Sequence, residues 1–207
     1  MGKLVLSKSG LQKQRENMRL YERVLPSLEL KRMQLTAELK RARQALVDVQ
    51  AETERRFQQV SLQLPMLADG ETDLAGLVHV ESVDLQEENV VGVRLPRLVG
   101  IRCRIADYAM LAKPHWVDML ADQLEQMVTQ KALVQVTADR VRLLAAAARK
   151  VTQRTNLFEK ILIPQAKGNI RKIRIYLADA DRASVVRSKI TKRIRRKQAQ
   201  ALQGATP

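Results

Sequence analysis

The chain has 207 residues, of which 45% are hydrophobic, 29% are charged and only 3% are aromatic. Because rounded cores depend on large aromatic side chains, this composition favours long helices over a globular core. Lysine and arginine outnumber the acidic residues by 37 to 22, and the formal net charge of +15 implies an acidic partner. Nucleic acid, an anionic membrane surface and an acidic protein face are the three candidates.

The cellular location is indicated by what the sequence does not contain. Cys103 is the single cysteine, which excludes an internal disulfide and suits a reducing compartment. The apolar stretch near the N-terminus is too short for the core of a signal peptide, and no run approaches the roughly 18 apolar residues of a membrane span. The sequence predicts a cytoplasmic protein that reaches a membrane only through its partners.

Residues 1–64 are predicted to form the first of two long coiled-coil helices. Between residues 11 and 60, alternating steps of three and four fall mainly on apolar side chains, which is the spacing of a coiled-coil seam. A long, charged helix of this kind needs a partner helix to cover its apolar stripe. Pro26 lacks a backbone N–H and is expected to kink or pause the helix. The polar positions in the stripe are Gln14, Arg32, Thr53 and Arg56.

Residues 65–114 are predicted to be a loop followed by a β-hairpin. Glycine and proline are concentrated there, and residues 68–73 have the composition of a turn-rich loop. Valine and leucine alternate over residues 78–85 and again over 91–95, which predicts short strands on either side of residues 86–89. Pro96 restricts the second strand to an edge or an end.

Residues 115–198 are predicted to form the second coiled-coil helix. Its apolar spacing slips near residue 148 and again around Pro164, where steps of four lead from Phe158 to Ile170. Such insertions change the winding of a coiled coil, so the helix is expected to bend or to change its packing partner there. Residues 187–197 carry seven basic side chains and no acid, and residues 199–207 are predicted to be a frayed tail. The predicted fold is therefore mainly α, a long antiparallel two-helix coiled coil with a small β-hairpin and loop between the helices.

No catalytic constellation is found in the sequence. A phosphate-binding glycine loop is missing, and His79 and His115, the two histidines, are interpreted as ordinary surface or capping residues. Pairs of carboxylates such as Asp179 and Asp181 are two residues apart and lie on different faces of a helix. The chain is predicted to have no catalytic, metal or cofactor site of its own.

A more specific signal lies in the C-terminal third of the chain. Its pattern combines a basic and acidic group before Pro164, two isoleucines and an acidic pair after it, and a basic pair near the end. This pattern resembles the signature of the D subunit of V-type (vacuolar/archaeal-type) ATPases, and residues 7–46 resemble the bacterial branch of that family. The residues that carry the resemblance are Arg154, Asn156, Glu159, Lys160, Pro164, Ile170, Ile173, Leu177, Asp179, Asp181, Arg187 and Lys189.

The resemblance implies a non-catalytic rotor subunit in the central stalk of a rotary ATPase. Its partners would be the catalytic A and B subunits, the small F subunit of the stalk and the C/d subunit that caps the membrane ring. The residues expected to face the catalytic head are Arg154, Asn156, Glu159, Lys160, Pro164, Arg187, Lys189, Lys192 and Arg193. The residues expected to face the small F subunit are Val80, Val91, Val93 and Leu95.

The alternative is a basic coiled-coil adaptor or a nucleic-acid-associated protein. The net charge of +15 supports it. The scarcity of aromatic residues weakens it, since bases are commonly held by stacking on aromatic rings.

Overall fold

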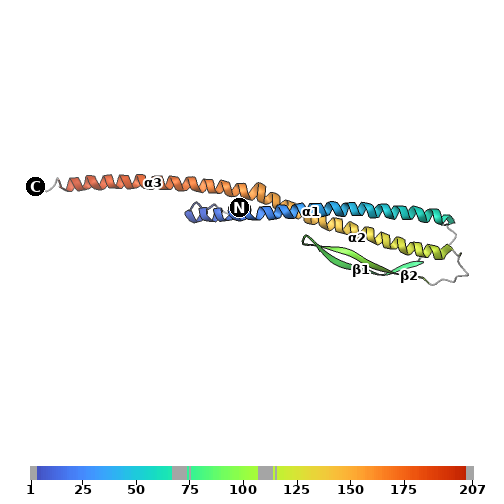
Figure 1. Cartoon of the computed structure of the whole chain (residues 1–207). Helices are drawn as coiled ribbons and strands as arrows, with labels where there is room; N and C mark the ends of the chain where they lie inside the picture. The colour runs from blue at the N-terminus through green and yellow to red at the C-terminus, as the bar shows by residue number, and fades with distance from the viewer. Residues whose placement is uncertain (1–3, 67–73, 75, 107–113, 115, 204–207) are drawn as a thin grey trace. The chain divides into compact units, whose positions relative to one another are not determined.

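The structure, a computed structural model of the whole chain, describes residues 4–66, 74, 76–106, 114 and 116–203. It confirms the predicted fold class, because two long helical regions are separated by a two-stranded antiparallel hairpin (Figure 1). The predicted loop at residues 68–73 and the histidine at position 115 lie outside the described residues. The elements are α1 (Lys8–Gln63), β1 (Val78–Val90), β2 (Val93–Ile105), α2 (Trp116–Leu157), the π-helical turn η2 (Phe158–Leu162) and α3 (Ile163–Gln203).

The chain divides into two compact units, which are described separately. The hairpin unit comprises residues 30–152, and the end unit comprises residues 1–29 together with 153–207. Helices α1 and α2 contribute residues to both units.

In the hairpin unit, α1 and α2 run antiparallel with two hydrophobic clusters between them. One cluster joins Leu35 of α1 to Leu144 of α2 and also includes Leu95 of β2. The second cluster places Leu64, just after α1, with Val117 at the start of α2. Leu35 and Val117 have no exposed surface. Because increasing residue numbers in α1 meet decreasing numbers in α2, the two helices form the predicted antiparallel pair in this unit.

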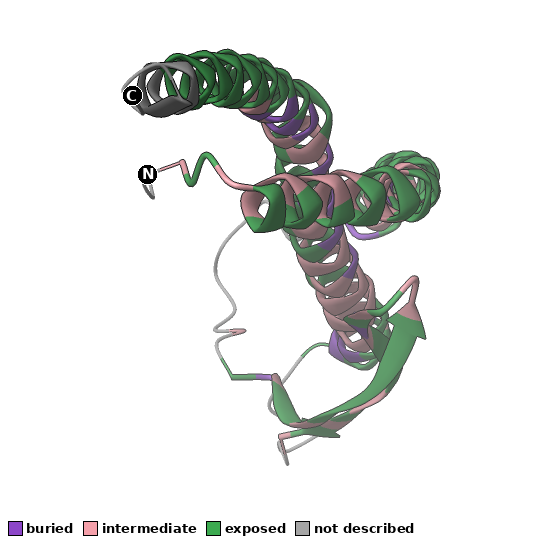
Figure 2. Cartoon of the chain, turned by 90° about the vertical axis from the view of Figure 1, so that its left-hand side faces the viewer, coloured by how far each residue is buried: buried purple, intermediate pink, exposed green. Residues whose placement is uncertain are grey.

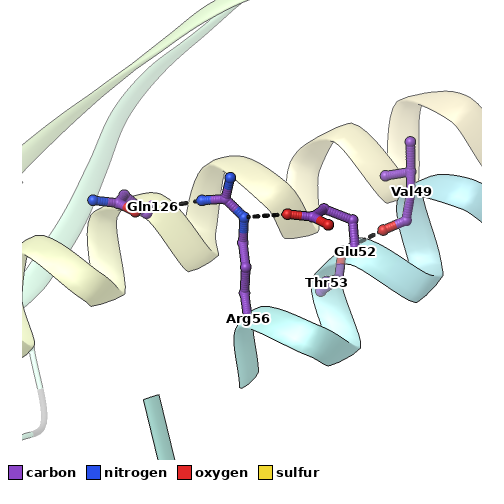
Figure 3. Close-up of polar contacts among 5 residues, drawn as sticks. All are labelled: Val49, Glu52, Thr53, Arg56 and Gln126. Carbon is purple, nitrogen blue, oxygen red and sulfur yellow. Dashed lines mark hydrogen bonds and ion pairs between the residues drawn. The ribbon is translucent and has the colours of Figure 1, made fainter. Parts of the chain in front are cut away.

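A polar bridge explains why the predicted stripe of α1 is interrupted at two positions near its end (Figure 3). Arg56 Nε donates a hydrogen bond to Glu52 Oε1 of the same helix and forms an ion pair with it, at 3.1 Å. The Arg56 guanidinium also donates to Gln126 Oε1 of α2, over 3.4 Å. Thr53 donates its hydroxyl to the Val49 carbonyl one turn earlier, at 2.8 Å. Polar side chains at these positions are therefore hydrogen-bonded.

Pro26 does not interrupt α1. The helix is continuous from Lys8 to Gln63 with the proline inside it, so the predicted pause is wrong. The next residue, Ser27, donates its hydroxyl to the Val24 carbonyl at 2.8 Å. The carbonyl that Pro26 leaves without an α-helical N–H partner is that of Glu22, one turn earlier, so the Ser27 bond is separate from it.

The hairpin turns at residues 91–92, later than the predicted turn at 86–89. Val90 pairs with Val93, and the two residues between them both have positive φ, 53° for Val91 and 76° for Gly92. This is the geometry of a two-residue turn that matches the twist of its strands. The polar residues 86–89 instead continue β1, where Glu87 forms an ion pair with Arg94 of β2. Pro96 lies inside β2. Because the sheet has two strands, both are edge strands, and the predicted restriction of Pro96 to an edge strand is met.

In the end unit, α1 begins with a serine cap. The Gly10 N–H donates to Ser7 Oγ at 3.0 Å, which satisfies one of the free donors of the first turn. A Cβ at Gly10 would lie 2.3 Å from the Val5 carbonyl oxygen, so the close return of the chain before the helix requires glycine.

The end unit has a short core and a long exposed helix. Ile163, Ala166, Ile170 and Ile173 of α3 are buried, whereas every residue from 178 to 197 is exposed (Figure 2). Helix α3 continues to Gln203, past the predicted helix boundary at residue 198. Among the described helices, none combines the length and apolar character needed to cross a membrane.

Candidate functional site

The π-helical turn η2 has a clear local cause in Pro164. A proline in an α-helix clashes with the carbonyl four residues earlier, which here belongs to Lys160, and supplies no N–H to it. In η2 the Ile163 N–H donates to the Phe158 carbonyl, five residues back, so the turn is wider by one residue. Such wide turns occur often at functional sites.

The extra residue changes which side chains face the core. Continuing the three-and-four spacing from Phe158 would bury Leu162, Gln165 and Asn169. The structure instead buries Ile163, Ala166 and Ile170, each one position later. The predicted slip near Pro164 is therefore a one-residue insertion that brings apolar residues, rather than two amides, into the core.

Most of the predicted head-facing residues in and near this turn are exposed. Arg154, Glu159, Lys160 and Pro164 are exposed, and Asn156 is half-buried. On the inner side, the Phe158 ring packs edge-on against the Tyr21 ring of α1, with centroids 5.4 Å apart and planes at 84°. An aromatic pair thus fixes the inner side of the turn and leaves polar groups at its surface.

The predicted basic residues near the C-terminus lie on a fully exposed part of α3. Arg187, Lys189, Lys192 and Arg193 are all exposed. Ile190 and Ile194 share this segment and are 52% and 50% exposed, so an apolar pair lies among the basic groups. We call residues 187–197 the basic end. Its side chains are available to a partner on every face of the helix.

The four hairpin residues predicted to meet a partner do not share one surface. Leu95 is 1% exposed inside the chain's own core, and Val91 and Val93 pack against the same cluster. Val80 is 48% exposed and is the only one of the four whose side chain is largely free. The exposed apolar residues elsewhere on the hairpin are Val83, Leu85, Val99 and Ile105.

Arg140 of α2 fastens the hairpin to the helix and was not singled out from the sequence. Its Nη1 donates to Glu88 Oε2 of β1 and to the Pro96 carbonyl of β2, both at 3.0 Å. One side chain therefore binds both strands. A hollow of about 420 Å³ beside it is lined by residues from α1, α2 and the hairpin, including Arg41 and Arg97.

Comparison with known proteins identifies the family. The family described as the D subunit of ATP synthase matches residues 10–193. The chain belongs to this family. It is 31% identical to the V-type ATP synthase D subunit of Borreliella burgdorferi over 93% of this chain and 95% of that protein. It is 29% identical to the protein of the same name in Chlamydia muridarum, over 91% and 94% of the two chains. Identity to the Chlamydia abortus protein of that name is 31%, over 91% of both chains.

The family assignment confirms the resemblance of the C-terminal pattern to a D subunit. The matched region contains the π-helical turn, the hairpin and most of the basic end. The role of Arg140 was not predicted from the sequence, because its two hydrogen-bond acceptors are 52 and 44 residues away along the chain. The sequence carries no local signal for this contact, because the strand register that places Glu88 in β1 is known only from the structure.

Cys103 lies in surroundings that make its thiol less reactive. Burial raises the pKa of the Cys103 thiol above its ordinary value, and the Glu125 carboxylate on α2 raises it further. Both effects disfavour the thiolate, which is the nucleophilic form. Cys103 is therefore a partly buried, free thiol whose surroundings disfavour its reactive form.

Proposed function

We propose that this D subunit is the central-stalk rotor of a V-type ATP synthase. It carries torque between the catalytic head of A and B subunits and the membrane ring that translocates ions. It is non-catalytic itself, is peripheral to the membrane through the complex, and also contacts the small F subunit of the stalk and the ring-capping C/d subunit. The family match over residues 10–193 is the observation that carries this proposal.

The form of α3 supports a role in contacting a surrounding partner. Residues 178–197 are exposed around the whole helix, so different catalytic interfaces can meet different faces of the same segment. A rotor must favour different nucleotide states at different interfaces, and it can do so only through contacts that differ between them. The mixture of cations and the Ile190/Ile194 pair on the basic end provides such differences.

The π-helical turn supports a second contact with the head. Glu159 and Lys160 lie beside each other on its exposed side, and Ile161 is 52% exposed. Because the Tyr21–Phe158 pair fixes the inner side, these three side chains are presented on a defined backbone.

The small F subunit of the stalk is proposed to bind the outer surface of the hairpin. Val80 remains in this interface, joined by the exposed Leu85 and Val99. Val91, Val93 and Leu95 contribute indirectly, because they anchor the hairpin on its own helices.

Purification of the tagged full chain from its source tests the proposal. We expect two large subunits and a small one to copurify, and ATPase activity to remain after nuclease treatment. Nucleic acid that is released by salt, with no ATPase, would establish the alternative of a basic nucleic-acid-associated protein.

The basic end is tested by replacing Arg187, Lys189 and Arg193 together with alanine. All three are exposed, so the fold is expected to be unaffected, while ion pumping per ATP hydrolysed falls several-fold in the reconstituted complex. Ion uptake into vesicles and phosphate release are measured in parallel. Pumping at the normal ratio would remove the basic end from the mechanism.

A further inference from the structure

A groove in the end unit combines an apolar floor with a wholly cationic rim. It lies between the first part of α1 and the first part of α3 and has a volume of about 860 Å³. The floor is formed by Met18, Ile170 and Ile175. The rim carries two cations from α1 and three from α3, and no lining residue is acidic. The rim residues are Arg15, Arg19, Lys167, Arg171 and Arg174.

The rim cations form no ion pair with another described side chain. Among the described residues, none of the five takes part in a salt bridge. Spacing of four residues places Arg15 above Arg19 and Lys167 above Arg171 on their helices, so like charges line each side. Like charges at this spacing repel one another, and an acidic ligand would remove that repulsion.

The floor distinguishes between the possible acidic ligands. Ile175 is 54% exposed, and no aromatic residue lines the groove. Nucleic acid held by stacking needs aromatic rings, and a phosphate group alone makes no use of an apolar floor. An amphipathic helix with apolar residues on one face and carboxylates at its edges matches both parts, which is the helix-in-groove mode of recognition.

We infer that this groove binds an acidic amphipathic helix of a partner protein. The inference rests on the proposed function in taking that partner to be another component of the same complex. The groove is separate from the basic end, since its residues lie at positions 15–19 and 167–175.

The first test uses the isolated full chain with a synthetic helix of glutamate and leucine at amphipathic spacing. A scrambled peptide of the same composition is the control. We expect the amphipathic peptide to bind roughly tenfold more tightly by fluorescence anisotropy. The variant R15Q/R171Q/R174Q should lose most of that preference. The variant K8Q/K13Q/R23Q, which removes the same charge outside the groove, should keep it. Equal binding of the two peptides, or equal effects of the two variants, would overturn the inference.

The second test separates the inference from the proposed function. A photo-crosslinking amino acid is placed at Met18 in the groove, or at exposed Gln12 as a control, and the complex is then purified. We expect the Met18 adduct to map to a partner helix that carries aspartate or glutamate along one edge. The inference alone would be overturned if the complex assembles but Met18 crosslinks to no acidic helix, or crosslinks to lipid or nucleic acid instead. Failure to recover any component of an ATPase would instead contradict the proposed function, and the peptide test would still decide the groove.

Discussion

Arg140 shows how a single side chain can determine the position of a whole element. Its Nη1 reaches a carboxylate on β1 and a backbone carbonyl on β2, while only a quarter of the side chain is exposed. The planar guanidinium can serve two acceptors in fixed directions, which the point charge of a lysine cannot do as well. A two-stranded hairpin is marginal alone, so its attachment to α2 matters for its order.

Replacing Arg140 with alanine should loosen the hairpin without unfolding the helices. Loss of the two bonds is expected to cost about 1 kcal/mol, because Glu88 remains partly solvated. Hydrogen exchange should accelerate in β1 and β2 and remain unchanged in α1. Arg142→Ala is the control, since Arg142 is 76% exposed and its ion pair is with Asp139, one turn away on the same helix. Equal exchange in the two variants would refute the role of Arg140.

Cys103 gives a pH-dependent prediction at the same scale. Because burial and Glu125 raise the pKa of the thiol, the thiolate fraction at pH 8 is below that of a free cysteine. Alkylation by iodoacetamide should therefore be slow at pH 8 and rise with pH to a midpoint above that of the free amino acid. Glu125→Gln should lower the pKa and accelerate the reaction a few-fold at pH 8, whereas Glu22→Gln in the end unit should not. A rate that is insensitive to Glu125 would contradict this account.

At the scale of elements, the π-helical turn lets residues on both sides of it face the same core. Within the end unit, Thr155 is buried before the turn, and Ile163 and Ala166 are buried after it. A helix that kept the three-and-four spacing of a coiled-coil seam could not bury both sets, because the second set lies one position later than that spacing places it. Pro164 favours the wide turn at the point where the extra residue is needed.

This account predicts that the extra residue and the proline can be removed together. Deleting Ile161 while replacing Pro164 with alanine should give a regular α-helix with the same core positions, with stability within about 1 kcal/mol of the parent. Deleting Ile161 alone leaves a proline inside a regular helix and should cost about 3 kcal/mol. Guanidinium unfolding of both variants provides the measurement. If the double change is as destabilising as the deletion, the turn is not a simple insertion.

How far the sequence predicted these elements depended on the range of the interactions involved. The apolar stripes predicted both long helices and the slip at Pro164, because the burial of a coiled-coil seam follows local spacing. The hairpin turn was predicted too early, because residues 86–89 are polar. Their charges in fact pair across to Arg94 and Arg140. Leu95 was predicted as a contact residue because alternation alone cannot tell which strand face the chain's own helices cover.

At the scale of the whole molecule, the exposed end of α3 contributes nothing to the core of the chain. The ion pair between Asp179 and Arg182 is on the surface, where such pairs stabilise little. A segment of this kind is maintained for what it contacts outside the chain rather than for the stability of the fold.

Removing residues 178–207 should therefore leave the unfolding free energy of the remainder within about 0.5 kcal/mol of the parent. Truncation before Ile163, which removes four buried residues of α3, should in contrast destabilise the end unit strongly. Urea unfolding followed by circular dichroism compares the two. The variant that lacks only residues 178–207 should still fail to support coupled pumping in the complex. A large loss of stability on removing residues 178–207 would show that the segment has a partner within the chain.

The strained backbone of Val91 has a consequence for the order of folding. A β-branched residue at φ 53° is unfavourable by about 1–3 kcal/mol, and asparagine or glycine would fit the turn better. Val91 is held there because its side chain packs against the Leu35 and Leu144 cluster, which the two helices create. The hairpin thus depends on a surface that exists only after α1 and α2 have paired. The strands are expected to register late, on a helical template, rather than to nucleate the fold.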